Sequence, residues 1–345
     1  MRILKSISLN IMGSLLTFTV GVAKAQPTEG PAGLTGKSVV FVASDLRNGG
    51  VRTVSEAFAE AAKTLHWKLK IINCMGNKNQ VSRAMQETVN SKTDGIILGG
   101  FDGADYRTQL KHAKSRGIKV VGWHAAAKPG PNQYMFVNIT TDAEDVAAAA
   151  AAQIPHYGAK SGGVILLTDR DYSMATTKTL ALKRAIEKLK NFRLLIVEDL
   201  PLSRSDQKIP HLVKSWNQRF GKQWTHTVGI NDLYFDHMAE ALHTVKREDV
   251  VGIGAGDGSP EAILRVRQEV SPQLVTVAEP LRTQGWQLVD ELNRAMAREK
   301  PSGYQTELII VSRQTLNGLK AENIEEKIPY KNAYMKIWFP DKSVE

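Results

Sequence analysis

Polar and aromatic side chains follow almost every apolar run of this 345-residue sequence. The residues in these positions are Asp45, Asn48, Phe101, Trp123, His124, Asn231, Asp232, Asp257 and Glu279. Carboxylates accept hydrogen bonds from hydroxyl groups, amides and imidazoles also donate them, and aromatic rings offer an apolar face. Because an unpaired buried polar group costs about 1–3 kcal/mol, this combination is typical of a site for a small, hydroxylated ligand.

Each of these residue types also has an ordinary structural use, because Asp and Asn form turns and helix caps. Trp123 is equally compatible with a place in the core. The functional interpretation therefore depends on the position that these residues share, directly after a predicted strand.

Sequence motifs for catalysis, metal binding and cofactor binding are absent. The glycines from Gly252 to Gly258 do not match the dinucleotide fingerprint, because the sixth position counted from Gly254 is Ser259. The histidines are dispersed without an HExxH motif, and no Gly-x-Ser-x-Gly nucleophile elbow occurs. With Cys74 as the only cysteine, a Cys-based metal site is excluded. We expect no catalytic residue, no metal site and no cofactor.

The elements that position these residues alternate regularly along the chain. Short apolar runs suited to buried strands are separated by segments with helical spacing of apolar residues, in units of roughly 25 residues. Expected strands lie at 38–43, 69–72, 95–98, 118–123, 135–138, 163–167, 192–197, 225–230, 250–253, 273–277 and 307–311. This alternation predicts an α/β protein with two doubly wound parallel sheets. Ligands bind beyond the carboxyl ends of such strands, so two facing halves would line one cleft.

The N-terminus carries the features of a secretory signal peptide. Arg2 and Lys5 precede an apolar run at 11–22, and Ala23-Lys24-Ala25 is a small-x-small cleavage pattern before Gln26. We therefore expect residues 1–25 to be a signal peptide and the mature protein to lie in the periplasm. Loss of this segment lowers the formal charge from +10 to +7. The remaining basic residues are scattered, so no nucleic-acid partner is expected.

The ordered set of segments resembles the type I periplasmic solute-binding proteins of sugar ABC transporters, such as ribose-binding proteins. The resemblance rests on the loop with Asn48, on segments 94–98 and 118–123, on Ile230-Asn231-Asp232, and on 250–254 leading to Asp257. It implies two lobes joined by three hinge segments near Thr141, Glu279 and Ser312. The implied lobes are 37–141 with 280–312, and 142–279 with 313–330.

The resemblance also implies ligand contacts by position. These fall on Asn48, His124, Thr176, Asn231, Asp257 and Glu279.

Several of these positions depart from the ribose-binding pattern. Gly49 and Gly50 stand where ribose binders have aromatic residues, His124 replaces an acidic residue, Thr176 an arginine, and Glu279 an amide. The loss of arginine and the gain of a carboxylate favour a ligand other than ribose, one that donates hydrogen bonds or carries positive charge.

The function expected from this resemblance is capture of a small polar, sugar-like ligand and its delivery to an ABC permease in the inner membrane. The protein is expected to be a monomer and not an enzyme. Two alternatives remain at this point: presentation of the ligand to a chemotaxis or signalling receptor, and binding of a small molecule other than a sugar.

Overall fold

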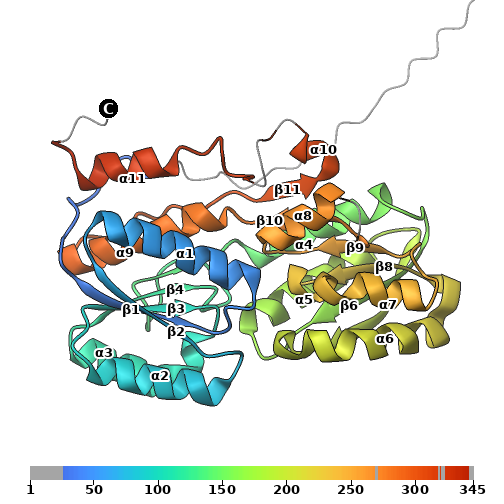
Figure 1. The fold of residues 1–345 in the computed structure, drawn as a ribbon, viewed down its shortest axis with the longest axis horizontal. Helices are drawn as coiled ribbons and strands as arrows, with labels where there is room; N and C mark the ends of the chain where they lie inside the picture. Colours follow the sequence, from blue (N-terminus) through green and yellow to red (C-terminus); the bar gives the residue numbers. More distant parts are fainter. Residues whose placement is uncertain (1–25, 269–270, 318, 320–322, 342–345) are drawn as a thin grey trace, which may run out of the picture.

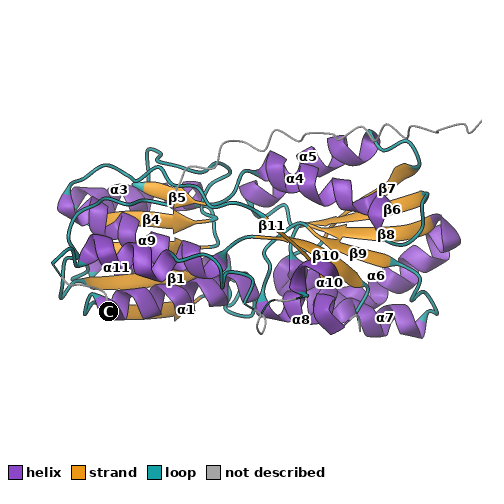
Figure 2. Cartoon of the chain, turned by 90° about the horizontal axis from the view of Figure 1, so that it is seen from above, coloured by secondary structure: helices purple, strands orange, loops and turns teal. Residues whose placement is uncertain are grey.

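The computed structural model describes residues 26–341 except 269–270, 318 and 320–322, so the expected signal peptide at 1–25 lies outside the described residues. Two lobes lie side by side, each a sheet flanked by helices (Figures 1 and 2). Within the described part of the chain, none of the helices combines the length and apolar character needed to cross a bilayer.

The first lobe contains a five-stranded parallel sheet in the order β2-β1-β3-β4-β5. Its elements in chain order are β1 (Ser38–Ala43), α1 (Gly49–Thr64), β2 (Lys68–Asn73), α2 (Lys78–Asn90), β3 (Gly95–Gly99), the short helix η1 (Gly103–Tyr106), α3 (Arg107–Ser115), β4 (Lys119–Trp123) and β5 (Val137–Ile139). The strands agree with the predicted ranges to within a few residues, and the helices lie in the segments between them.

Successive residues of β1 point to opposite faces of the sheet and enter different cores. Val39 and Phe41 pack with α1, whereas Val40 and Val42 pack with α2 and α3. Both faces are covered (Figure 1), which explains why the strand sequence is continuously apolar rather than alternating.

The second lobe contains a six-stranded sheet in the order β11-β10-β9-β8-β6-β7. Its elements are α4 (Ala143–Gln153), β6 (Gly162–Thr168), α5 (Ser173–Glu187), β7 (Phe192–Asp199), α6 (Ser205–Phe220), β8 (Trp224–Gly229), η5 (Asp232–His237), α7 (Met238–Thr244), β9 (Val251–Gly254), α8 (Pro260–Gln268), β10 (Gln273–Ala278), β11 (Ile309–Ser312) and α10 (Arg313–Leu316). Within this described sheet, β11 runs antiparallel to β10 and the other neighbouring strands are parallel. The predicted fold class, with two doubly wound and mainly parallel sheets, is confirmed.

The chain returns to the first lobe through α9 (Leu281–Ala297), which packs closely against α1. It passes between the lobes at 140–142, at 279–280 and again between the end of α9 and β11. Here the structure differs from the predicted boundary at residue 312. Because β11 pairs with β10, residues 309–312 belong to the second lobe.

A further crossing follows α10. The last described helix, α11 (Tyr330–Trp338), packs on α9 of the first lobe, where Trp286 and Trp338 stack with ring centroids 5.5 Å apart. This helix was not predicted, and the expected lobe limit at 330 falls where it begins.

Candidate functional site

A cavity lies between the lobes at the carboxyl ends of both parallel sheets. Six of the predicted residues line it: Asp45, Asn48, Trp123, His124, Asn231 and Asp257. Asp45 and Asn48 follow β1, and Trp123 is the last residue of β4 with His124 directly after it. Asn231 and Asp257 follow β8 and β9 of the second lobe. The space between these residues, with its open mouth included, is about 680 Å³.

The lobes are closed over this cavity. Asp102 of the first lobe accepts hydrogen bonds of 2.6 Å from both the backbone nitrogen and the hydroxyl of Ser173. Lys78 pairs with Asp171 across the mouth at 2.8 Å. These contacts are exposed, and we therefore expect each of them to contribute little to closure on its own.

Asn231 and Asp257 form a buried pair in the second lobe. Asn231 Nδ2 donates to Asp257 Oδ2 at 2.7 Å, and its Oδ1 accepts from the backbone of Leu233. Burial raises the pKa of Asp257, although the nearby His124 and Lys178 oppose this shift. Among the described residues Asp257 Oδ1 has no hydrogen-bond donor, so one carboxylate oxygen can accept from a ligand.

Lys178 is a cavity residue that the sequence analysis missed. Its ammonium group donates to the carbonyl oxygens of Ile230 at 3.2 Å and Ala255 at 2.6 Å, at the ends of two neighbouring strands. An ammonium has three donors, so one N–H remains for a ligand oxygen. Lys178 lies inside α5, two residues after Thr176, the position on this helix that was predicted to contact the ligand. In the sequence, Lys178 falls on the same helix face as Met174, Ala175, Ala181 and Leu182. A lysine on an otherwise apolar face would have indicated a functional residue.

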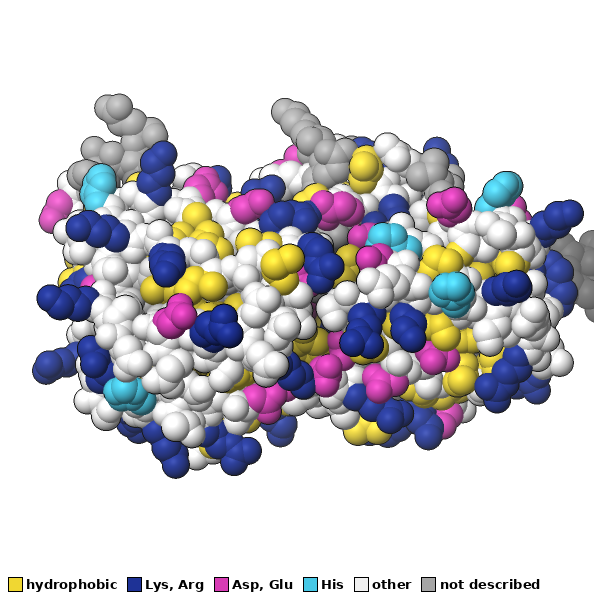
Figure 3. All heavy atoms as spheres, turned by 60° about the horizontal axis from the view of Figure 1, so that its bottom comes forward, with side chains coloured by type: hydrophobic (Ala, Val, Ile, Leu, Met, Phe, Trp, Pro, Cys, Tyr) yellow, Lys and Arg dark blue, Asp and Glu magenta, His cyan; other side chains and the backbone are white. Residues whose placement is uncertain are grey.

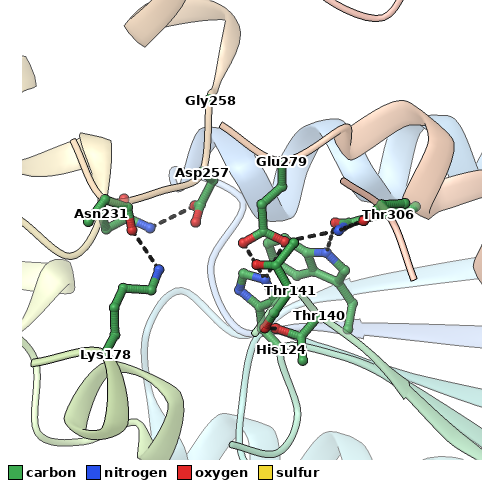
Figure 4. A network of polar contacts seen from close by, with 12 residues as sticks. His124, Thr140, Thr141, Lys178, Asn231, Asp257, Gly258, Glu279 and Thr306 are labelled. Atoms are coloured by element: carbon green, nitrogen blue, oxygen red, sulfur yellow. Dashed lines mark hydrogen bonds and ion pairs between the residues drawn. The ribbon is translucent and has the colours of Figure 1, made fainter. Parts of the chain in front are cut away.

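His124 and Glu279 connect the cavity to the hinge. Figure 4 shows Glu279 pointing toward His124, whose Nε2 lies 3.1 and 3.2 Å from the two carboxylate oxygens. Gln284 donates to the same carboxylate at 2.9 Å. Burial alone would raise the pKa of Glu279, but His124, Lys178 and Gln284 outweigh it and lower the pKa to about 2.

The His124 ring also stacks on Trp123, with centroids 4.0 Å apart and an interplanar angle of 7°. Trp123 Nε1 donates to Gln284 at 2.7 Å, which fixes the indole beneath the imidazole. The backbone of His124 has φ of 48°, a left-handed conformation that is uncommon outside glycine. Such conformations persist where the surrounding contacts hold them, as they do here.

A nitrogen and two carboxylates from His124, Asp257 and Glu279 lie within 4.8 Å of one another. This set has the donor types of a metal site, but each side chain already has a protein partner. Asp257 is bonded to Asn231, and Glu279 to His124 and Gln284. The three side chains are therefore held in hydrogen bonds of the protein itself.

Asn48 and Asp45 come from the loop after β1. Asn48 Oδ1 caps α1 by accepting from the backbone of Gly50 and Val51, which leaves its Nδ2 without a described partner in the cavity wall. The two carboxylate oxygens of Asp45 accept hydrogen bonds from the backbone nitrogen, Nε and Nη2 of Arg47. Its acceptor capacity is therefore largely used within the loop.

The structure does not bring Phe101 or Thr176 to the cavity, which corrects two of the predicted contacts. Phe101 follows Gly100, whose φ of 79° turns the chain, and its ring packs on Tyr106 at 5.2 Å in the core. On α5, Ala175 and Lys178 face the cavity. Thr176 is exposed on another side of the helix, and its hydroxyl donates to Tyr172.

Asp232 and Glu279 lie behind the cavity lining. Asp232 is buried and accepts hydrogen bonds from the backbone of Gly258 and from the side chains of Gln273 and Thr276. Burial raises the pKa of Asp232 to about 6. Its position is that of a support for the loop carrying Asp257, and Glu279 supports His124 in the same way.

Comparison with known structures identifies the same architecture in solute-binding proteins. The twin-arginine translocation pathway signal protein of Burkholderia phytofirmans aligns with a TM-score of 0.75 at 16% identity, over 87% of this chain and 97% of the other. The 5-methylthioribose transporter solute-binding protein of Thermotoga lettingae gives 0.74 at 14%, over 91% and 97%. GanP, a glucose-galactose binding protein of Geobacillus stearothermophilus, gives 0.69 at 18%, over 81% and 98%.

Similarity at these identities establishes the fold. A search of curated proteins finds no significant match. The profile of a family described as "Periplasmic binding protein domain" matches residues 39–300, most of the chain. Together with the two lobes closed over an interlobe cavity, this match shows that the chain belongs to the periplasmic binding protein domain family, whose members bind ligands and are not enzymes.

Proposed function

We propose that this protein captures an uncharged, sugar-like ligand in the interlobe cavity and delivers it to an ABC permease of the inner membrane, after export directed by residues 1–25. Solved structures with the same fold support a sugar-like ligand. Solved neighbours contain bound allitol and myo-inositol, and others are described as glucose-galactose and 5-methylthioribose binding proteins.

The observation that carries the proposal is the set of unused hydrogen-bonding groups in the cavity. Lys178 and Asn48 offer donors, and Asp257 offers an acceptor, from opposite lobes. A hydroxyl group both donates and accepts, so a polyol can satisfy all three. Only the closed form presents both lobes to the ligand, and ligand binding therefore favours closure.

The charges near the cavity favour a neutral ligand over a cation. In the cavity wall Lys178 offsets the charge of Asp257, and Arg47 pairs with Asp45. The buried Glu279 lies behind the lining and is hydrogen-bonded to His124 and Gln284. Lys178 supplies a cationic donor that the sequence analysis did not include. The prediction of a positively charged ligand rested on the loss of arginine and the gain of a carboxylate. The ammonium group of Lys178 in the cavity weakens this argument.

A thermal-shift screen tests this proposal with pentoses, hexoses, inositols, linear polyols, amino sugars and amino acids. A ligand present at 100 times its Kd stabilises the folded protein by about 2.7 kcal/mol, which raises Tm measurably. We expect a neutral sugar or polyol to give the largest shift, confirmed by calorimetry. A shift confined to amino acids or other charged compounds would contradict the proposal.

A further inference from the structure

We infer that the ligand is amphipathic: a hydroxylated head at the hinge end of the cavity joined to an apolar substituent that lies against a hydrophobic wall of the second lobe. This inference rests on the proposed function and refines the ligand that it names.

The hydrophobic wall is formed by residues from three loops or helix starts of the second lobe. Its members are Tyr172, Met174, Ala175, Leu202 and Leu233, all of which line the cavity. Tyr172 packs against both the first-lobe core around α2 and α3 and the second-lobe core. The wall is therefore continuous with buried apolar packing.

The first lobe adds few polar side chains opposite this wall. Gly76 and Gly100 line the cavity without a side chain, and Val51 is apolar. Asp45 is nearby, but three Arg47 nitrogen atoms already occupy its oxygens. The neutral polar groups of the first-lobe lining are the Ser44 hydroxyl and the Asn48 amide, and the second lobe adds the hydroxyls of Ser203 and Tyr172.

The strong hydrogen-bonding groups of the cavity are Lys178, Asn231, Asp257 and His124, and the wall adjoins them at Leu233, whose backbone nitrogen donates to Asn231. These residues are connected through hydrogen bonds to the strand ends and the hinge, as Figure 4 shows. Met174 and Lys178 are four residues apart on α5, so about one helical turn separates the apolar wall from the polar end.

A free hexose has hydroxyl groups all around its ring. Those directed at Tyr172, Met174 and Leu202 would lose water without gaining a partner, which lowers affinity. A substituent of a few carbon or sulfur atoms would bury apolar surface there instead. Each buried methylene improves affinity by about fourfold.

Calorimetry on the full mature chain tests the inference with matched compounds. The compounds are D-ribose, D-glucose and D-galactose, each compared with its methyl and n-propyl glycosides. For at least one sugar we expect the n-propyl glycoside to bind about tenfold more tightly than the free sugar, with a larger negative heat-capacity change.

The possible results separate the inference from the proposed function. If a free sugar binds as tightly as its glycosides, the amphipathic ligand is wrong and the sugar-binding proposal stands. If none of these sugars or glycosides binds while the thermal-shift screen finds a polyol or inositol ligand, this inference is wrong and the proposed function stands. If the screen also finds no neutral ligand, both fail.

Variants of the wall provide a second measurement. Met174→Gln should reduce the ratio of n-propyl glycoside affinity to free-sugar affinity by about tenfold, because it places an amide against the substituent. Leu202→Asn, at a half-buried site that tolerates substitution more readily, should have the same effect if Met174→Gln does not fold. Asn231→Ala should instead weaken binding of the glycoside and of the free sugar equally, so that the ratio of their affinities is unchanged. An unchanged ratio in a folded wall variant would overturn the inference.

Discussion

Asp257 and Asn231 show how one side chain can both shape a loop and remain available to a ligand. The alternative role of Asp257, as cap of the helix that follows, is taken by Ser259, whose hydroxyl accepts from the backbone of Ala262. Asp257 is instead bonded to Asn231 by one oxygen. Its burial is best explained by the cavity that it lines.

Replacing Asp257 with Ala should weaken binding of the ligand found in the screen by about 1.5–3 kcal/mol, because the variant lacks a charged hydrogen-bond acceptor. This loss corresponds to roughly ten- to hundredfold in Kd. The melting temperature without ligand should change little, since the carboxylate carries a desolvation cost that the variant removes.

Asp290→Ala is a matched control, because Asp290 is a buried carboxylate of α9 that pairs with Arg294, far from the cavity lining. It should lower Tm and leave Kd unchanged. An unaltered Kd for Asp257→Ala would remove this residue from the site.

Glu291 is a second buried carboxylate, and its pKa predicts how stability depends on pH. Burial in α9, with a contribution from Asp290, raises its pKa from 4.5 to about 7 despite hydrogen bonds from Ser302. The folded state therefore binds a proton that the unfolded state has released between these values. The resulting stability is present below pH 4.5 and is lost as pH rises through 7.

Glu291→Gln should remove this loss, since an amide does not ionise. Relative to the unsubstituted protein, we expect higher stability at pH 8 by on the order of 2–3 kcal/mol. Urea unfolding from pH 5 to pH 8 measures the difference. Equal slopes of stability against pH in the two proteins would show that Glu291 does not titrate in this range.

At the level of elements, the C-terminal segment completes a helix that is distant in sequence. Pro280 precedes α9 without a side-chain cap. Glu325 supplies one, accepting from the backbone nitrogens of Arg282 at 2.9 Å and Thr283 at 2.7 Å. A carboxylate at a helix N-terminus is also favoured by the helix dipole.

Glu325→Ala should therefore destabilise the protein by about 1–2 kcal/mol, as loss of an N-cap does. Urea unfolding measures this, with the exposed Glu299→Ala as a control that should change stability little. Equal stability of the two variants would show that the C-terminal segment does not cap α9 in solution.

At the level of the whole molecule, Gly49 and Gly50 allow the two lobes to meet. A Cβ on Gly50 would lie 2.8 Å from Asp257 Cγ, and one on Gly49 would lie 2.7 Å from Glu261 Oε2. The absence of aromatic residues at these positions therefore corresponds to close contact between α1 and the loop before α8. The basic side chains, in contrast, are spread over both lobes in Figure 3 rather than gathered in one patch.

Gly50→Ala should oppose closure without harming either lobe. Alanine near the start of α1 should leave Tm without ligand equal or slightly higher, whereas ligand affinity should fall at least tenfold. Small-angle scattering with saturating ligand should give a larger radius of gyration than for the unsubstituted protein.

Gly285→Ala provides the contrast, because its Cβ would meet Ala57 within the first lobe. It should lower Tm and leave the closed conformation intact. Full compaction of Gly50→Ala by ligand would contradict the proposed role of this contact.

The sequence by itself determined the strands, most of the helices and the edge of each sheet where the cavity lies. The reason is local: apolar runs, helical periodicity and strand-end polar residues are all properties of short segments. Asn48, Asn231 and Asp257 could be placed in this way because each directly follows a strand.

Only the tertiary structure decided which side chains face the cavity and how the chain ends. Lys178 lies inside a helix, and its orientation depends on how α5 packs beside the ends of β8 and β9. Phe101 was turned into the core by a single glycine conformation. The pairing of β11 with β10, and the return of α11 to the first lobe, are contacts between residues far apart in sequence, which no short segment can specify.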